Sequence, residues 1–341
     1  MFRTIFQRSL PGLAALLALG GLALSSCSGG GSLPNTGNSS LPSTATSPLQ
    51  SQSLLNSLAR KQSASNALYV SDWFGKSIFR FARNADGSLV TPAGSSLVLS
   101  YNPGPIAIGH GGLFVTDEDA ESLFVYARHA TGYDQPRREL TLPFVPSCVA
   151  VDGAGHEFVG GFTNGYVAVY APGAQGNAST LQRIALPDGH ADINGVAVDS
   201  SGNLYVSDTN EISEFTTPVT NPTLKRAIVG TGQQNTPTGM DINNMTGTLY
   251  VANAGDNNII EYTRSANGKS HPHRTITSSN PALKGPVGVA LAGSVLYSTS
   301  GSNVNGPASI FVFDASKGQQ TPKQVVTGSY LALPIGVALG P

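Results

Sequence analysis

The 341-residue chain has few charged residues: Asp, Glu, Lys and Arg make up 11% of it, and its formal net charge is −1. A nucleic-acid-binding surface needs a basic face, so this composition argues against a nucleic-acid ligand. The sequence also lacks a G-x-S-x-G nucleophile elbow, zinc-ligand spacing and a glycine-rich phosphate loop. No long helical pattern follows residue 66, whereas 40 Gly and 22 Pro mark frequent turns. The composition therefore predicts an all-β protein without any of these three catalytic motifs.

A six-fold repeat fills the chain from Ala67 to the C-terminus. An aromatic residue recurs in an LYVSD-like strand at intervals of 44 to 47 residues, at Tyr69, Phe114, Phe158, Tyr205, Tyr250 and Tyr297. A period in the forties is typical of propellers and solenoids. Each repeat also contains a short apolar run, such as Val196-Ala197-Val198, and two further predicted strands. Four strands per unit predict six blades of a β-propeller.

The two ends of the repeat region complete one another. The first aromatic strand, Leu68 to Val70, has no apolar run ahead of it, and the last apolar run, Val337 to Leu339, has no strand behind it. We therefore predict that Pro334 to Leu339 forms the innermost strand of the first blade. Such a closure leaves no broken blade edge that could pair with another chain.

The fourth unit, Asn194-Gly-Val-Ala-Val-Asp-Ser-Ser-Gly-Asn-Leu-Tyr-Val-Ser-Asp208, resembles the NHL repeat, P-x-G-V-A-V-D-x-x-G-N-L-Y-V-A-D-x-x-N-x-x-I. In the other five units, the Asp that ends the aromatic strand is kept as Asp72 and Asp117 and replaced by Gly161, Asn253 and Thr299. The resemblance covers about four fifths of the chain. It implies a six-bladed, NHL-like β-propeller.

The resemblance leaves two functions open, since similar propellers include protein- and nucleic-acid-binding scaffolds, lyases and gluconolactonase-like hydrolases. The first expectation is a scaffold that binds a protein or a carbohydrate and requires no cofactor. The alternative is a hydrolase or lyase that depends on a metal, with calcium as the expected ion. A fold alone does not decide between them.

The first 26 residues have the form of a secretory signal: basic Arg3 and Arg8, an apolar stretch from Leu13 to Leu24, and no acidic residue. The following Cys27 completes Leu-Ser-Ser-Cys, which resembles the bacterial lipobox, whose Cys is diacylated and becomes the mature N-terminus. An ordinary cleavage site or an N-terminal transmembrane anchor is the alternative. By analogy, Ser28 after the Cys favours the outer membrane if the source is Gram-negative.

Residues 27–66 are rich in Ser, Gly, Pro, Thr and Asn. Such a segment cannot bury enough apolar surface to fold, so we predict a disordered tether with an average reach of about 35 Å. The predicted organisation is a signal peptide at 1–26, the lipidated Cys and tether at 27–66, and the propeller at 67–341. The lipid is the only membrane contact expected, and with Cys27 acylated the remaining Cys148 can form no internal disulfide. We expect a monomer.

Two sets of loops emerge on one face of a propeller, here called the top face: those between the second and third strands of each blade, and those that lead into the next blade. The candidate ligand-binding residues on this face are Trp73, Phe74, Asp117, Asp119, His190, Asp192, Asn194, Asp208 and Asn253. Carboxylate and amide oxygens suit calcium. Asp and Asn after a strand more commonly cap the turn that follows, and that interpretation is favoured.

Four individual positions carry further expectations. Trp73 and Phe74 are suited to stacking on a sugar or anchoring a protein, although core packing explains Trp73 equally well. Only His190 of six histidines falls on the top face, so a converging catalytic pair is not expected. Asp241 stands where the other five inner strands have Ala, and is predicted to be a hydrogen-bond hub between blades or a group facing the tunnel. Cys148 replaces a Gly and is expected to be a small packed residue.

Overall fold

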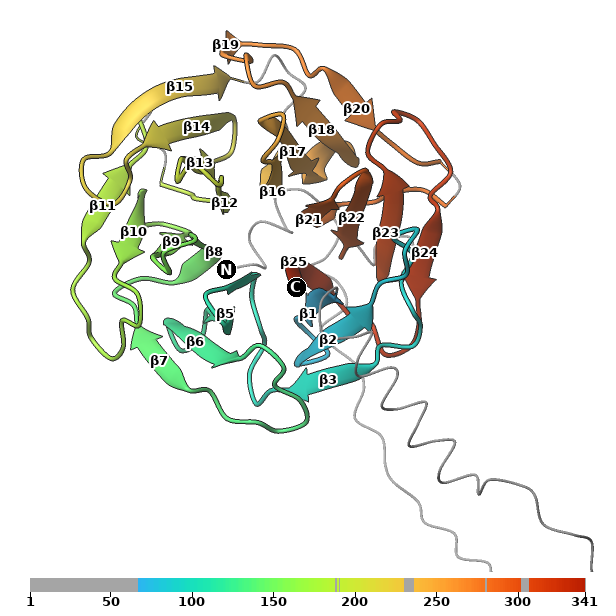
Figure 1. The fold of residues 1–341 in the computed structure, drawn as a ribbon, viewed down its shortest axis with the longest axis horizontal. Helices are drawn as coiled ribbons and strands as arrows, with labels where there is room; N and C mark the ends of the chain where they lie inside the picture. The colour runs from blue at the N-terminus through green and yellow to red at the C-terminus, as the bar shows by residue number, and fades with distance from the viewer. Residues whose placement is uncertain are drawn as a thin grey trace, which may run out of the picture.

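The computed structural model of the protein describes residues 67–187, 189, 191–229, 236–279, 281–301 and 307–340. Six β-sheets surround a central axis like the blades of a propeller (Figure 1), which confirms the predicted fold. Five of the sheets have four strands, and the sheet of the fourth blade along the chain has a short fifth strand. Among the described residues, no helix is long and apolar enough to cross a membrane.

Within each blade the strands run antiparallel from the axis outward, and the chain visits the blades in order. The first three blades consist of β25 (Pro334–Gly340), β1 (Ala67–Asp72), β2 (Ser77–Ala82) and β3 (Ser95–Val98); β4 (Ile106–Gly109), β5 (Gly112–Asp117), β6 (Ser122–Ala127) and β7 (Arg138–Thr141); and β8 (Pro146–Val151), β9 (Glu157–Gly161), β10 (Tyr166–Tyr170) and β11 (Gln182–Ala185).

The remaining three blades follow the same order. They consist of β12 (Gly195–Val198), β13 (Leu204–Ser207), β14 (Glu211–Thr216) and β15 (Thr223–Val229), with β19 (Gly268–Lys269) parallel to β15; β16 (Pro237–Asn243), β17 (Thr248–Asn253), β18 (Asn258–Tyr262) and β20 (Arg274–Ile276); and β21 (Pro286–Ala292), β22 (Val295–Ser300), β23 (Ser309–Asp314) and β24 (Gln324–Thr327).

The C-terminal strand closes the ring as predicted. Strand β25 pairs antiparallel with β1, with Leu68 opposite Leu339 and Val70 opposite Val337. In Figure 1 the red β25 therefore lies beside the blue β1 near the axis. The first blade is thus built from both ends of the propeller, and β1 has no free inner edge.

The core lies between the blades, because each sheet is covered on both faces. In β1 every residue is buried. Leu68 and Val70 pack with Val295 and Tyr297 of the sixth blade, whereas Tyr69 packs on the other face with second-blade residues such as Val115. A strand buried on both faces has no polar alternation. This explains why the aromatic strands are apolar runs in the sequence.

Glycine at the start of the inner strands allows neighbouring blades to approach closely. A Cβ atom on Gly195 would lie 2.2 Å from the carbonyl oxygen of Thr238 in the next blade. The equivalent atoms on Gly239 and Gly288 would each lie 2.7 Å from a carbonyl oxygen of the following inner strand. The Gly of the repeated Gly-Val-Ala-Val pattern is therefore required by contact between blades.

The outer strands are also tied to the next blade around the ring. A side chain near the start of the fourth strand donates a hydrogen bond to a backbone carbonyl in the third-to-fourth-strand loop of the following blade. These donor and acceptor pairs are Arg138 with Ala174, Gln182 with Thr220, Arg226 with Ala266, Arg274 with Ala315, and Gln324 with Leu89. Between the first two blades, the backbone N–H of Val98 donates to the Gly132 carbonyl oxygen at 2.6 Å.

Candidate functional site

The carboxylates at the ends of the aromatic strands bind backbone amides. Asp117 is 3% exposed and accepts hydrogen bonds from the N–H groups of Asp119 and Ala120, at 3.0 and 3.2 Å. Asp208 accepts from Asn210 and Glu211, both at 2.7 Å. These contacts cap the turn after each strand. Burial raises the pKa of Asp117, and the hydrogen bonds from the two backbone N–H groups partly offset this increase.

Asp72 extends this pattern to the closure of the ring. Its two carboxylate oxygens accept hydrogen bonds from the backbone N–H groups of Gly75, Ala332 and Leu333 at 2.7 to 2.8 Å. One side chain thus fixes its own turn and the segment that leads into β25. In the fifth blade, the amide of Asn253 donates to Asp256 and Asn258 at 3.0 and 3.1 Å.

Each of these side chains forms hydrogen bonds within or beside its own turn. They do not converge on a common metal-binding position. Within the part of the chain that the structure describes, no group of three or more His, Cys, Asp or Glu residues is placed to hold a metal ion. Asp119 is exposed and Asp192 is half-buried. His190 lies outside the described residues. The expectation of calcium stays a prediction.

The two aromatic candidates on the top face differ in their surroundings. Trp73 packs against a small apolar cluster made of Phe162, Val287, Leu333 and Ile335. Its neighbour Phe74 has 60% of its surface exposed. Packing therefore accounts for Trp73, whereas Phe74 presents an aromatic ring to solvent.

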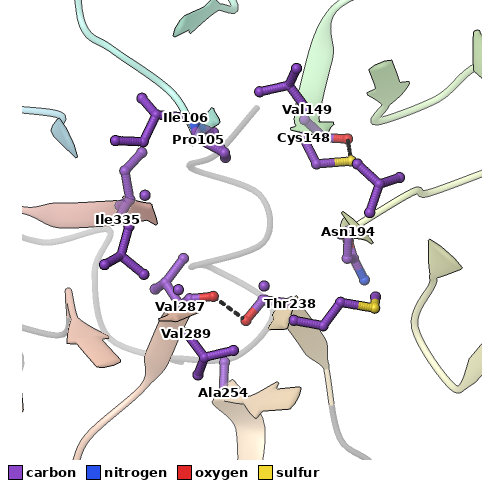
Figure 2. A pocket seen from close by; sticks show the side chains of 18 of the residues that line it. Pro105, Ile106, Cys148, Val149, Asn194, Thr238, Ala254, Val287, Val289 and Ile335 are labelled. Carbon is purple, nitrogen blue, oxygen red and sulfur yellow. Dashed lines mark hydrogen bonds between the residues drawn. The ribbon is translucent and has the colours of Figure 1, made fainter. Parts of the chain in front are cut away.

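An apolar cavity of about 130 Å³ lies on the axis of the propeller, lined by residues from all six blades. Ile106, Val149, Met240, Val289 and Ile335 supply much of its apolar wall (Figure 2). None of the described lining residues is charged. No local sequence pattern predicts this cavity, because its lining comes from six segments that are distant along the chain.

Asn194 is the one sequence-predicted candidate that lines this cavity. It directly precedes β12, and its backbone N–H donates to the Ser207 carbonyl oxygen at 2.8 Å. Figure 2 shows its carboxamide at the wall of the cavity, with the amide nitrogen at the visible end. The side-chain oxygen is buried and has no hydrogen-bond partner. A buried unpaired acceptor costs about 1–3 kcal/mol, so such an atom needs an explanation.

Two central positions that depart from the repeat have structural roles. Cys148 is 4% exposed and packed, as expected, and burial raises the pKa of its thiol to about 12, so the unreactive thiol form persists at neutral pH. Asp241 accepts hydrogen bonds at 2.7 Å from the backbone N–H groups of Ile242 and, in the next blade, Leu291. These contacts confirm the predicted hub between blades. Burial raises the pKa of Asp241 to about 6.

No family model matches the chain, and no curated protein matches it. Many solved structures share its fold. A chain in the crystal structure of a nidogen/laminin complex is 16% identical, with a TM-score of 0.63, over 81% of this chain and 98% of that one. A protein of unknown function from Bacteroides caccae is 12% identical, with a TM-score of 0.60, over 81% and 99% of the two chains.

A third structure, of a functionally unknown protein from Desulfotomaculum acetoxidans DSM 771, is 14% identical, with a TM-score of 0.51, over 79% of this chain and 83% of that one. At such identities the likeness concerns the fold alone. Together with the ring of six blades it defines the class: this chain is a six-bladed β-propeller.

Proposed function

We propose that this chain is an exported, NHL-like propeller, anchored to a bacterial membrane by lipid on Cys27, whose top face binds a protein or glycan partner. The observation that carries the proposal is the exposure of Phe74 on that face. Aromatic residues, including Phe, are enriched in the buried cores of protein interfaces, and their flat apolar faces suit stacking on sugar rings.

The turn that carries Phe74 is held in place before any partner arrives. Asp72 accepts the N–H of Gly75 at 2.8 Å, and the N–H of Trp73 donates to the Leu333 carbonyl oxygen at 2.9 Å. Trp73 is packed against the apolar cluster beneath. An aromatic ring on an ordered turn loses little conformational entropy on binding, which favours affinity.

The solved structures give support from analogy. One similar propeller was crystallised within a nidogen/laminin complex, in which a protein partner is present. We place the metal-dependent hydrolase or lyase second, because both side-chain oxygens of Asp72 and one each of Asp117 and Asp208 accept backbone hydrogen bonds, as expected of residues that cap turns.

The test of the binding face is site-specific photo-crosslinking in cells of the source organism. A photoreactive phenylalanine analogue replaces Phe74 in one variant and Met245 in the control. Met245 is 87% exposed in the turn between β16 and β17, on the opposite face. We expect a discrete crosslinked partner at position 74 and none of the same mass at position 245.

Affinity for the partner so identified is then measured with Phe74→Ala and Met245→Ala. Loss of an anchoring aromatic ring should weaken binding at least about tenfold, or about 1.4 kcal/mol, whereas the control should bind like the unmodified chain. Equal affinities for the two variants would refute the assignment of the binding face.

The lipid anchor is tested separately with Cys27→Ser. We expect the unmodified protein to fractionate with membranes and to carry a diacylated N-terminal Cys by mass spectrometry. The variant should move to the soluble fraction. A variant that remains in the membrane fraction would favour the transmembrane-anchor alternative and contradict lipidation.

A further inference from the structure

We infer that the face opposite the top face docks on an anionic lipid bilayer while the lipid on Cys27 holds the chain there. This bottom face consists of the connections between the first and second strands and between the third and fourth strands of each blade. The inference rests on the proposed lipid anchor and adds a second membrane contact to it. Three observations carry it: where the chain enters the propeller, where exposed apolar side chains lie, and how charge is divided between the faces.

The chain enters the propeller on the bottom face. Strand β1 is the second strand of the first blade, so Ala67 lies at its bottom end and Asp72 at its top end, beside the turn that carries Phe74. A tether that ends at Ala67 therefore joins the face that we assign to the membrane. An average reach of about 35 Å would still allow the propeller to turn over, so the tether alone does not set its orientation.

Exposed apolar side chains are concentrated on the bottom face. Of six large apolar side chains that are exposed among the described residues, only Phe74 lies on the top face. The other five come from the bottom connections or, in one case, from the bottom end of β15, and they belong to five different blades: Val90, Tyr133, Leu181, Leu224 and Met245. Tyr133 and Met245 are the most exposed, at 79% and 87%. Tyr is enriched at membrane–water interfaces.

Charge is divided between the faces in the same sense. The described bottom connections, with β19 included in the one from β18 to β20, carry Arg83, Arg128, Arg137, Arg264, Lys269, Lys317 and Lys323 against Asp86, Asp134, Asp152 and Asp199. The described top connections carry Lys76 and Lys284 against Glu118, Asp119, Glu121, Asp192, Asp208 and Asp256. An anionic membrane surface therefore attracts the bottom face and repels the top face.

The cations of the bottom face are better placed to reach a lipid headgroup than its carboxylates. Asp152 and Asp199 each accept two backbone N–H groups of their own turns, at 2.8 and 2.9 Å, and are half-buried. In contrast, Arg137, Lys269 and Lys323 are exposed. Long side chains of this kind can extend a charge toward a surface while their methylene groups cover apolar contacts.

A bilayer fits this arrangement better than a single protein partner does. The exposed apolar side chains come from five blades, which are arranged around the axis (Figure 1), so they are spread around the propeller and not gathered in one patch. A broad, laterally fluid surface can accept each of them separately. The electrostatic part is screened by salt, and we expect docking without the lipid to be too weak to retain the chain on membranes. Docking thus sets orientation, with Phe74 directed away from the lipid.

The test attaches the chain from Cys27 onward to vesicles through a maleimide lipid on the Cys27 thiol. Cys148 does not compete, because it is buried and burial raises the pKa of its thiol to about 12. A photoreactive amino acid replaces Met245 on the bottom face or, in the control, the exposed Asn210 on the top face. The vesicles contain phosphatidylcholine alone or equal parts of phosphatidylcholine and phosphatidylglycerol, and the lipid crosslinked to each chain is quantified by mass spectrometry.

On the anionic vesicles, we expect the yield of lipid crosslinks at position 245 to exceed that at position 210 at least about tenfold, because two Lys side chains near such a surface already favour docking about thirtyfold. The ratio of the two yields should be smaller on phosphatidylcholine alone. Tyr133→Ser should lower the ratio on the anionic vesicles, whereas Phe74→Ser, on the top face, should not.

A matched pair of double variants tests the charges. Lys269→Gln with Lys323→Gln should lower the ratio at least about fivefold, the contribution of one Lys near an anionic surface. Lys76→Gln with Lys284→Gln removes the same charge from exposed positions on the top face and should not lower the ratio. All four side chains are exposed, so folding should be unaffected.

Three outcomes would overturn the inference. Two are equal lipid yields at positions 245 and 210 on anionic vesicles, and a loss of less than about twofold in the bottom-face variant, which is well below the effect of one Lys. The third is a discrete protein crosslink at position 245 in cells without lipid crosslinks on vesicles, which would assign this face to a protein. Chemical attachment keeps the two proposals separate: a chain that docks on vesicles but carries no diacylated Cys27 in cells refutes the anchor and leaves the docking face supported.

Discussion

Replacing Gly195 with alanine would place a methyl group where the next blade already lies. The added Cβ would be 2.2 Å from the Thr238 carbonyl oxygen and 2.9 Å from the Ser207 hydroxyl oxygen. The first of these is a backbone atom, so a side-chain rotation cannot relieve the contact. The same carbonyl accepts the Ser207 hydroxyl at 3.1 Å, a hydrogen bond that joins the fourth and fifth blades.

The expected loss of stability has two parts. Overpacking in a close-packed interior costs about 1–3 kcal/mol. Displacing the Ser207 hydrogen bond adds about 1 kcal/mol. We therefore expect Gly195→Ala to lower the free energy of unfolding by about 2–4 kcal/mol. For a propeller of this size, the melting temperature should fall by roughly 3–7 °C.

The assay is urea and thermal unfolding of the two glycine variants Gly195→Ala and Gly153→Ala, followed by circular dichroism. Gly153 is a matched control, because an added Cβ there meets nothing within 4 Å and the residue is exposed. It should be neutral or stabilising by up to about 1 kcal/mol, since alanine restricts the unfolded chain. If Gly195→Ala changes the unfolding free energy by less than about 0.5 kcal/mol, close contact between blades does not explain the repeated glycine.

Three further predictions concern other contacts of the ring. Deleting residues 334–341 removes β25 and exposes the inner edge of β1, so we expect loss of cooperative melting; a melting temperature within a degree or two of the intact chain would contradict closure. Arg226→Met leaves the buried carboxylate of Glu214 without its Arg partner and should cost about 3 kcal/mol in urea unfolding, whereas Lys225→Met, at a side chain 45% exposed, should cost less than about 1 kcal/mol. Burial raises the folded-state pKa of Asp241 from 3.8 to about 6, so the folded chain binds more protons than the unfolded chain between these values. This group's contribution to stability should therefore rise as pH falls from about 7 to 5, and urea midpoints at both pH values should show that Asp241→Ala removes this gain.

Sequence reasoning was sufficient for the fold, because a strand buried on both faces leaves a strong pattern. The recurring aromatic strands and the Val-Ala-Val runs gave the blades, and the unmatched ends gave the closure by β25. Sequence reasoning did not predict the hydrogen bonds that join each outer strand to the following blade. Arg226 and Gln324 make equivalent contacts to a carbonyl of the next blade, but they share no charge or shape that a repeat would reveal.

The candidate site was less accessible to sequence reasoning. Both roles for the Asp and Asn residues, ligand and turn cap, were expected, and only hydrogen-bond geometry shows that Asp117 and Asp208 cap their turns. The axial cavity was missed because its wall combines residues from six distant segments, such as Phe162 and Met240. Its volume depends on how those side chains pack, which no local pattern encodes.

The six inner strands are not identical at the axis of the propeller. Six identical inner strands would present the same group six times, a pattern that gives a small ligand no preferred orientation. Here the strands differ: Asn194 places a carboxamide in the wall, Cys148 has a thiol where four other strands have glycine, and Asp241, within its strand, binds two backbone amides. Gly195, Gly239 and Gly288 allow neighbouring blades to approach closely, and a side chain added there would collide with the next blade. Differences among the blades at the axis must therefore come from the variable position ahead of each inner strand, where Asn194 lines the cavity, and from the few substitutions within the strands.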